Sequence, residues 1–136
     1  MKKFDVVALG ELLIDFTENG ISANGNLLLE ANPGGAPCNV LAMLASLEKT
    51  TAFIGKVGND RFGKVLSETI KDCGICADGL VFDDIVHTTL AFVHKKTDGD
   101  RDFSFYREPG ADMMLRKCEI DEEIIKSAKI FHFGTL

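Results

Sequence analysis

Long hydrophobic runs and an excess of positive charge are both missing from this chain of 136 residues. No stretch approaches the roughly 18 apolar residues of a membrane-spanning helix, so no membrane partner is expected. Lys and Arg number 15 against 21 Asp and Glu, and the net charge of −6 argues against nucleic acid as a partner. Only Val6–Gly10 is apolar between Asp5 and Glu11, which is too short for a signal peptide. We therefore expect a soluble cytoplasmic protein.

Internal repeats, low-complexity segments and recognisable linkers are also missing. Hydrophobic residues make up 46% and charged residues 26% of the chain, which is the composition of a globular protein. At roughly 150 residues per domain, the length allows one domain with a core of its own.

Cysteine occurs at four positions: Cys38, Cys73, Cys76 and Cys118. Without an export signal, these are expected to be free thiols. The CxxC pair at 73 and 76 follows a helical apolar pattern that ends at Gly74, whereas a reactive CxxC lies at the start of a helix. No second CxxC occurs and the three histidines show no ligand spacing. We therefore expect neither redox chemistry nor a metal site.

Hydrophobic periodicity divides the chain into alternating strands and helices. Apolar runs predict strands at residues 4–10, 12–16, 27–29, 51–57 and 130–133. Helical spacing predicts helices near residues 37–47, 61–73 and 121–128. The apolar face of the first helix is expected to consist of Val40, Met43, Leu44 and Leu47. A loop is expected at 19–26, and a hairpin from 88–94 and 102–107 around a polar turn at 95–101.

This alternation predicts an α/β fold with a mainly parallel sheet and a small antiparallel addition. The sequence ends three residues after the last expected strand, at Gly134-Thr135-Leu136. In an open parallel sheet, the carboxyl end of a strand leads into a functional loop and a covering helix, and neither follows here. We therefore expect an incomplete portion of a larger α/β domain.

Two segments near the N-terminus carry groups suited to binding a small molecule. Asp15 is a carboxylate inside an apolar run, and two adjacent sugar hydroxyls could supply the donors that it needs. The alternative is a strand-end Asp in contact with water. Gly34 and Gly35 precede a helix whose first turn holds Asn39, so backbone and amide groups could approach a ligand there. The alternative is a glycine-rich turn that begins a helix.

A third candidate is the segment 102–107, in which alternate residues of an extended strand face the same way. Phe103, Phe105 and Arg107 would share one face, with Ser104 and Tyr106 on the other. Aromatic rings beside a guanidinium suit a sugar ring and its hydroxyls. A half-buried strand with a solvated Arg is the alternative.

Neither of two common nucleotide-binding motifs is present, although one of them is nearly matched. The segment Gly58–Val65 nearly fits GxxxxGK[ST], but Val65 replaces the hydroxyl that would bind Mg²⁺. Asn59 or Asp60 is better interpreted as the N-cap of the helix that follows. No GxGxxG follows a strand, which disfavours a Rossmann nucleotide-binding domain.

Taken together and in order, these segments resemble the PfkB (ribokinase-like) carbohydrate kinases, and among them the fructokinases. The resemblance spans almost the whole chain, through ALGELLID at 8–15, NPGGAPCN at 32–39, IGKVGNDRFG at 54–63, TLAFV at 89–93, FYREPGAD at 105–112 and FHFG at 131–134. It implies a ribokinase-like three-layer α/β/α fold with a mainly parallel central sheet, of which 1–136 would be the N-terminal part. A small β lid, from strands near 12–30 and 88–107, would be inserted in this core. Two positions depart from the family pattern: Leu41 stands where a small residue is usual, and Glu48 where Gly or Ser usually follows the helix.

The resemblance also implies an activity, its cofactors and its binding residues. Family members transfer the γ-phosphoryl group of ATP to a sugar hydroxymethyl group, with Mg²⁺ and often a monovalent cation such as K⁺. By position, Asp15, Gly35 and Asn39 would bind sugar hydroxyls, and Gly34 would complete a hinge. Phe92, Phe105 and Arg107 would belong to the lid, which would cover the sugar and exclude water.

The family's catalytic base is an Asp in a Gly-Ala-Gly-Asp-like motif of the C-terminal half, and nothing in these 136 residues matches it. We therefore expect the sugar-binding and lid half of an ATP-dependent fructokinase that makes fructose 6-phosphate, inactive alone, with its nucleotide-binding residues elsewhere. Exposed hairpin edges favour a homodimer through the lid. One alternative is a kinase for another sugar or sugar acid, such as 2-keto-3-deoxygluconate, since Arg107 could pair with a carboxylate. Another is a non-catalytic sugar-binding or dimerising fragment.

Overall fold

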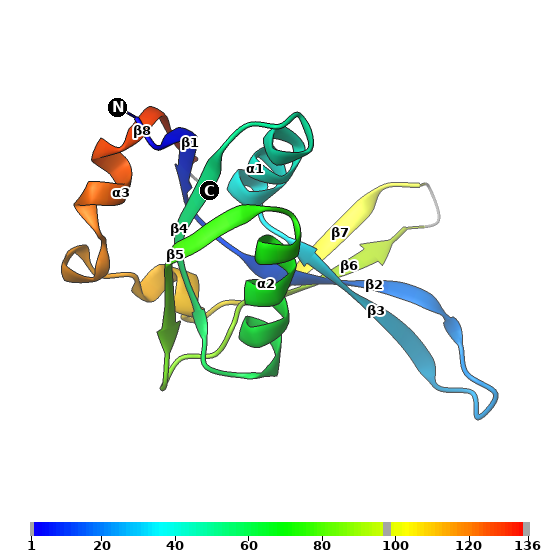
Figure 1. The fold of residues 1–136 in the computed structure, drawn as a ribbon. Coiled ribbons are helices and arrows are strands. Elements are labelled where there is room, and N and C mark those ends of the chain that lie inside the picture. Colours follow the sequence, from blue (N-terminus) through cyan, green and yellow to red (C-terminus); the bar gives the residue numbers. More distant parts are fainter. Residues whose placement is uncertain (1, 97–98, 135–136) are drawn as a thin grey trace.

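The computed structural model describes residues 2–96 and 99–134, and its strands form two separate sheets (Figure 1). Sheet A is parallel, with strand order β5-β4-β1-β8. Its strands are β1 (Phe4–Leu9), β4 (Thr51–Gly58), β5 (Ile75–Asp83) and β8 (Ala128–Phe133). Sheet B is mixed, with strand order β3-β2-β6-β7. Its strands are β2 (Leu13–Ile21), β3 (Leu27–Gly34), β6 (Leu90–Lys95) and β7 (Arg101–Tyr106).

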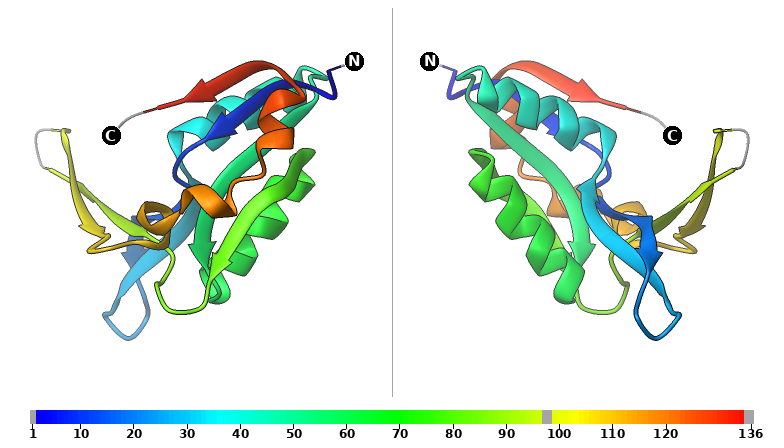
Figure 2. Two further views of the ribbon diagram at one scale, coloured as in Figure 1. Left: turned by 90° about the vertical axis from the view of Figure 1, so that its left-hand side faces the viewer. Right: turned by 90° about the vertical axis from the view of Figure 1, so that its right-hand side faces the viewer.

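Helices cover both faces of sheet A, which gives the three layers that the sequence predicts (Figures 1 and 2). The helices α1 (Ala36–Ser46) and α2 (Arg61–Asp72) pack on one face. The short helix α3 (Glu122–Lys126) packs on the other, after two 3-10 turns, η1 (Ala111–Met114) and η2 (Lys117–Glu119). The sheet is therefore apolar on both sides, as is usual for parallel strands.

The core has one cluster on each face of sheet A. The cluster beneath α1 and α2 includes Ala8, Leu41, Phe53, Leu66 and Ile70. The opposite cluster includes Val7, Ala52, Ile54 and Ile124. β4 is buried at every position, so its near-continuous apolar run has the burial expected of a central parallel strand.

The strands β2 and β3 are longer than the sequence predicts. β2 continues through Gly20 to Ile21, where a loop was expected, because it pairs with β3 through an irregular register after Glu18. β3 continues to Gly34, five residues beyond the predicted end at residue 29, and includes Pro33. A proline is tolerated there because β3 is an edge strand.

The strand β5 was not predicted at all. It contains Asp78 and Gly79, a pair that usually marks a turn. Here Gly79 lies against β4, where an added Cβ would lie 2.7 Å from the Phe53 carbonyl oxygen, and the register shifts between Ala52 and Ile54. The glycine therefore permits close strand approach instead of ending the strand.

The predicted apolar face of α1 is wrong in part. Val40, Met43 and Leu47 are exposed, whereas Cys38 and Leu41 are buried. The helix is apolar on more than one side, so its periodicity alone does not identify the side that meets sheet A.

The remaining elements follow the predictions more closely. The hairpin forms as β6 and β7, although residues 97–98 of its predicted turn lie outside the described part. α2 has Asp60 as its N-cap, and Gly74 follows its C-cap with a φ of 79°. The last helix covers fewer residues than expected. None of the helices in the described ranges is long and apolar enough to cross a membrane.

Candidate functional site

One face of sheet B, which we call the Asp15 face, collects side chains from four strands. Residues paired across neighbouring strands point to the same side of a sheet. One row of partners runs across the whole sheet: Asn32, Asp15, Ala91 and Phe105. The register therefore brings Asp15 and Phe105 to one surface, as the sequence predictions required.

Asp15 is the one acid of this row, and its environment is unusual for a carboxylate. The side chain is half-buried, and burial raises the pKa of Asp15 above its ordinary value. Its carboxylate has no hydrogen bond or ion pair with any residue that the structure describes. The Asp15 carboxylate is therefore a free acceptor that would gain from hydroxyl donors.

The two glycines hold the chain close to Asp15 and begin α1. A Cβ at Gly34 would overlap Oδ2 of Asp15, so only glycine lets the backbone lie this near to the carboxylate. Gly35 has a φ of 128°, and a Cβ there would overlap the Glu11 carbonyl oxygen. Close packing alone therefore requires glycine at both positions.

The first turn of α1 presents Asn39 to solvent. Its backbone N–H donates to the Gly35 carbonyl at 3.0 Å, and its side chain is exposed. Sequence reasoning missed Glu11, whose buried carboxylate accepts the Ala36 N–H at 3.0 Å and so satisfies the start of α1. In the sequence, Glu11 stands out as the single acid of the apolar segment that leads into β2.

Arg107, at the end of β7, is paired with a residue that was not predicted. Its Nε donates to Oδ2 of Asp112 at 2.9 Å, and its Nη2 contacts the same oxygen. The other oxygen of Asp112 accepts the hydroxyl of Thr89. Arg107 is therefore held at the base of sheet B instead of being solvated, which was the alternative from sequence.

Phe92 lies on the opposite face of sheet B, which we call the Phe92 face. Its ring stacks on Phe16, with centroids 5.1 Å apart, and contacts Tyr106 edge-on at the same distance. Phe105 stacks on Phe103 on the Asp15 face. The structure therefore does not bring Phe92 together with Asp15, because a shift of one residue in a strand reverses the side-chain direction.

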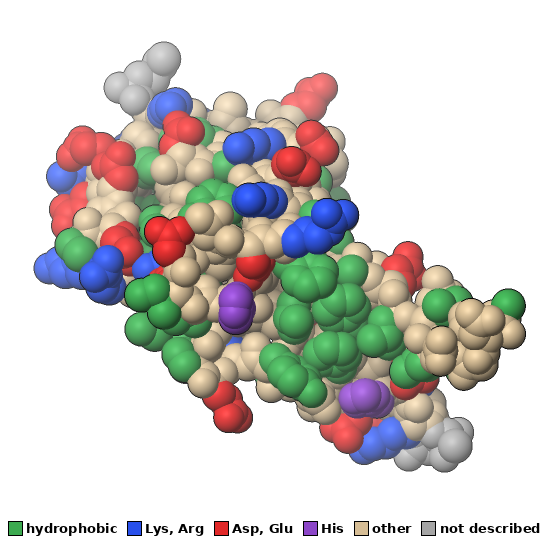
Figure 3. Space-filling view, turned by 90° about the horizontal axis from the view of Figure 1, so that it is seen from below, with side chains coloured by type: hydrophobic (Ala, Val, Ile, Leu, Met, Phe, Trp, Pro, Cys, Tyr) green, Lys and Arg blue, Asp and Glu red, His purple; other side chains and the backbone are tan. Residues whose placement is uncertain are grey.

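A cavity of about 880 Å³ has a lining that does not include Asp15. It is at the base of sheet B, and its lining includes Phe62, Tyr106 and Pro109 together with two of the predicted site residues, Phe105 and Arg107. Seen from below, hydrophobic side chains gather over sheet B (Figure 3). This surface is more apolar than a site for a polyhydroxylated ligand would be.

The near-matches to other motifs have structural explanations. Gly63 packs so closely on Gly58 that a Cβ would overlap its carbonyl oxygen, and its N–H donates to Oδ1 of Asp60 at 2.8 Å. The glycines of this segment thus allow close packing at the start of α2. Cys73 is the C-cap of α2, one residue before the predicted cap Gly74, so the CxxC pair lies at the C-terminal end of the helix as expected. No cluster of three possible metal ligands occurs within the described residues.

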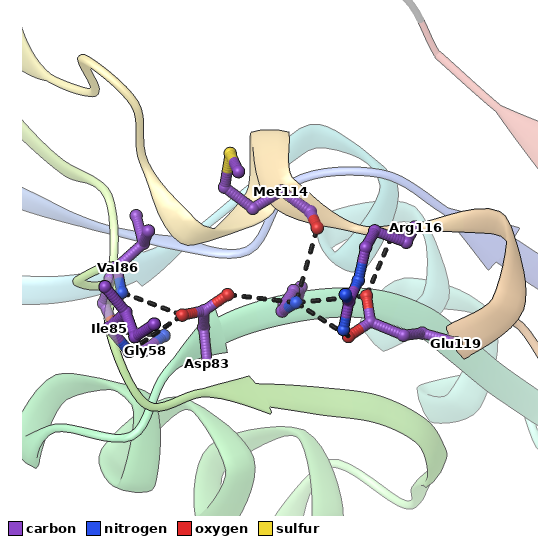
Figure 4. A network of polar contacts seen from close by, with 9 residues as sticks. Gly58, Asp83, Ile85, Val86, Met114, Arg116 and Glu119 are labelled. Carbon is purple, nitrogen blue, oxygen red and sulfur yellow. Dashed lines mark hydrogen bonds and ion pairs between the residues drawn. The ribbon is translucent and has the colours of Figure 1, made fainter.

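Lys56 forms a buried ion cluster at the carboxyl end of sheet A (Figure 4). Its Nζ lies 3.0 Å from Asp83 and 2.9 Å from Glu119, and donates to the Met114 carbonyl at 3.3 Å. Burial lowers the pKa of Lys56, but hydrogen bonds to the two carboxylates outweigh it and raise the pKa. One ammonium therefore joins the chain that enters β6 to the chain that leaves β7.

The partners of Lys56 are themselves hydrogen-bonded. Asp83 accepts the N–H groups of Val86 and Ile85, and these bonds, followed by Lys56, lower its pKa to about 2. Arg116, followed by Lys56, lowers the pKa of Glu119 to about 2. The segments before β6 and after β7 therefore carry ionised carboxylates that are held by charge-assisted hydrogen bonds.

The fold and its polar face define an α/β protein of the ribokinase-like class, and sequence comparison assigns the family. The model of the pfkB family of carbohydrate kinases matches residues 3–136, so the chain belongs to that family. It is 47% identical over 133 residues to "Probable fructokinase-6, chloroplastic" of Arabidopsis thaliana, covering 96% of this chain and 35% of the relative.

Solved structures agree with this assignment. The crystal structure of fructokinase from Xylella fastidiosa superposes with a TM-score of 0.88 at 34% identity, over 95% of this chain and 40% of that one. A sugar kinase from Pyrococcus horikoshii in complex with ATP gives a TM-score of 0.85 at 34% identity, over 95% and 42%. The chain therefore has part of the ribokinase-like fold and spans about two fifths of these relatives.

Proposed function

We propose that the protein containing these residues is an ATP-dependent kinase that converts fructose to fructose 6-phosphate. Residues 1–136 would carry its sugar-binding face and its lid. The family and the similarity to proteins named fructokinases support the reaction class. The observation that carries the sugar site is the unpartnered, half-buried carboxylate of Asp15.

Asp15 would bind two neighbouring sugar hydroxyls. An ionised carboxylate accepts from both, and each charge-assisted hydrogen bond offsets part of the cost of burying the charge. Gly34 and Gly35 would let the sugar approach the backbone, and the exposed amide of Asn39 would add a donor and an acceptor. Phe105 lies in the same row as Asp15 and would cover an apolar side of the sugar ring. Phe92 is left out because it points to the other face.

Sheet B would act as the lid. Its β6–β7 hairpin is entered through residues 84–89 and left through 107–119, and the Lys56 cluster ties both of these connections to sheet A. Closure of this sheet over the sugar would exclude water, which competes with the sugar hydroxyl for the phosphoryl group. Arg107 would position the sugar from the base of the sheet.

We infer that ATP, Mg²⁺ and any monovalent cation such as K⁺ are held outside residues 1–136. ATP would supply the γ-phosphoryl group, and the cations would neutralise its charge. A solved relative in complex with ATP supports use of this nucleotide. The sequence has no Gly-Ala-Gly-Asp-like motif, and without a base and an anion-binding helix the chain alone would not turn over.

A coupled kinase assay tests this function. A protein spanning the full length of the family should phosphorylate fructose, and residues 1–136 alone should not. The intact mass of the gene product separates a kinase of full length from a genuinely short, non-catalytic sugar-binding fragment. Turnover by 1–136 alone, or preference of the complete kinase for 2-keto-3-deoxygluconate, would contradict the proposal.

We also propose that the Phe92 face carries a homodimer contact. Leu29 and Tyr106 are exposed on this face, beside the Phe16–Phe92 stack. An apolar surface of this kind usually marks an interface, and two copies can pair it isologously. Light scattering should give a dimer mass for the kinase and a monomer mass for Tyr106→Asp. A monomeric unsubstituted kinase would contradict this contact.

A further inference from the structure

The carboxylate of Asp112 is almost completely buried beneath Arg107. Its side chain is 2% exposed, against 26% for Arg107. Oδ2 accepts from Nε and Nη2 of the guanidinium, and Oδ1 accepts from the hydroxyl of the buried Thr89. Gly110 permits this approach, because a Cβ there would overlap the Thr89 hydroxyl. Every oxygen of Asp112 is therefore matched.

This pairing changes what Arg107 can bind. A free guanidinium offers a carboxylate two parallel donors on one edge. In this chain, the edge formed by Nε and Nη2 is occupied by Asp112. The edge formed by Nη1 and Nη2 stays free for a ligand, but the net charge of the Arg107–Asp112 pair is close to zero. A second carboxylate brought to Arg107 would also meet the negative charge of Asp112.

We propose that Asp112 is a positioning residue that selects the charge class of the sugar. By neutralising and orienting Arg107, it favours a neutral ketose and disfavours a sugar acid such as a 2-keto-3-deoxyaldonate. This inference rests on the proposed kinase function and on Arg107 facing the sugar. It assigns the choice between the two substrate classes to one buried side chain.

The test removes the negative charge of Asp112 while keeping the shape of its side chain. In the complete kinase, Asp112→Asn can still accept from Arg107 and can donate to Thr89 through its amide. The ratio of kcat/KM for 2-keto-3-deoxygluconate to that for fructose should rise at least about tenfold, since a like charge beside the bound carboxylate is removed. The rise should come from a lower KM for the acid. Asp112→Ser carries the same prediction if Asp112→Asn does not fold.

Two control variants separate charge from structure. Thr89→Val removes the hydrogen bond between Thr89 and Asp112 but keeps the charge of Asp112, so the ratio should stay unchanged. In Arg107→Met, adding Asp112→Asn should no longer shift the ratio. A kinase active on fructose whose ratio is unaffected by Asp112→Asn and Asp112→Ser would overturn the inference and leave the proposed function standing. An unsubstituted kinase that prefers the acid, or accepts neither sugar, would overturn both.

Discussion

Partly buried carboxylates have opposite environments at the end of sheet A and on the Asp15 face of sheet B. At the end of sheet A, Asp83 and Glu119 are fully hydrogen-bonded around Lys56, and their pKa values are lowered to about 2. On sheet B, Asp15 has no partner among the described residues, and burial raises its pKa. Carboxylates with hydrogen-bond donors in the protein stabilise the fold. A carboxylate without such donors is retained where a ligand supplies them. The contrast separates the scaffold from the site.

The largest expected effect contrasts the cores of the two sheets. Phe53 in β4 is fully buried, and Phe53→Ala should lower the free energy of unfolding by about 3–5 kcal/mol through the cavity that it leaves. Phe103→Ala in β7, where the ring is 48% exposed, should cost much less. Urea unfolding measures both. Equal losses would contradict the view that the core lies mainly on sheet A.

The second effect is on activity and tests the unmatched charge. In the complete kinase, Asp15→Ala should lower kcat/KM for the sugar on the order of a hundredfold, since two charge-assisted hydrogen bonds are lost. Stability at neutral pH should be unchanged or higher, because a raised pKa means that the charged form is disfavoured in the folded state. Asp102→Asn, an exposed acid on the opposite face, is the matched control and should keep its activity. A similar loss in the control would argue against a local role for Asp15.

The third effect tests the matched charges. Lys56→Met should lower the free energy of unfolding by about 2 kcal/mol, since its carboxylates lose a charged hydrogen-bond donor. Lys129→Met, which removes an exposed ion pair with Asp5, should change it little.

The pH dependence of stability gives a second test of the Lys56 cluster. Because the folded pKa values of Asp83 and Glu119 are depressed to about 2, their contribution is complete above the ordinary values of 3.8 and 4.5. It is lost as the pH falls from about 4.5 towards 2. Unfolding curves across this window should show a weaker pH dependence for Lys56→Met than for the unsubstituted protein. An identical dependence would contradict the role of the cluster.

The smallest effect concerns the turn after α1. Glu48 has a φ of 60°, a left-handed conformation that costs a residue with a Cβ about 1 kcal/mol. Glu48→Gly should therefore raise the free energy of unfolding by about 0.5 kcal/mol, after the greater chain entropy of glycine is subtracted. Glu48→Ala should bring no such gain. Thermal melts of both variants decide the point.

Local patterns predicted most of sheet A, because burial on both faces leaves continuous apolar runs such as β4. They failed at β5, where Asp78 and Gly79 resemble a turn and only the neighbouring strand shows why the glycine is there. They failed again on α1, because this helix is apolar on several sides and its pattern does not show which side is buried. Leu41, despite its departure from the family pattern, is buried in the core.

In the candidate site, the sequence identified Asp15, Gly34, Gly35 and Arg107 as unusual residue types in unusual places. It could not identify Asp112, which looks like an ordinary acid beside a glycine until the fold sets it under Arg107. The family resemblance grouped Phe92 with Phe105 in the lid, and only the register of sheet B shows that the two rings lie on opposite faces.

The sequence by itself determined the parallel α/β core, the helix caps and the set of polar residues available for binding. These depend on periodicity and on local backbone preferences, which neighbouring residues carry. The tertiary structure decided which strand faces meet, which carboxylates find partners and which does not. Those outcomes depend on pairings between residues far apart in the sequence, such as Asp15 with Ala91. The free energy of such a pairing exists only once both strands are in register.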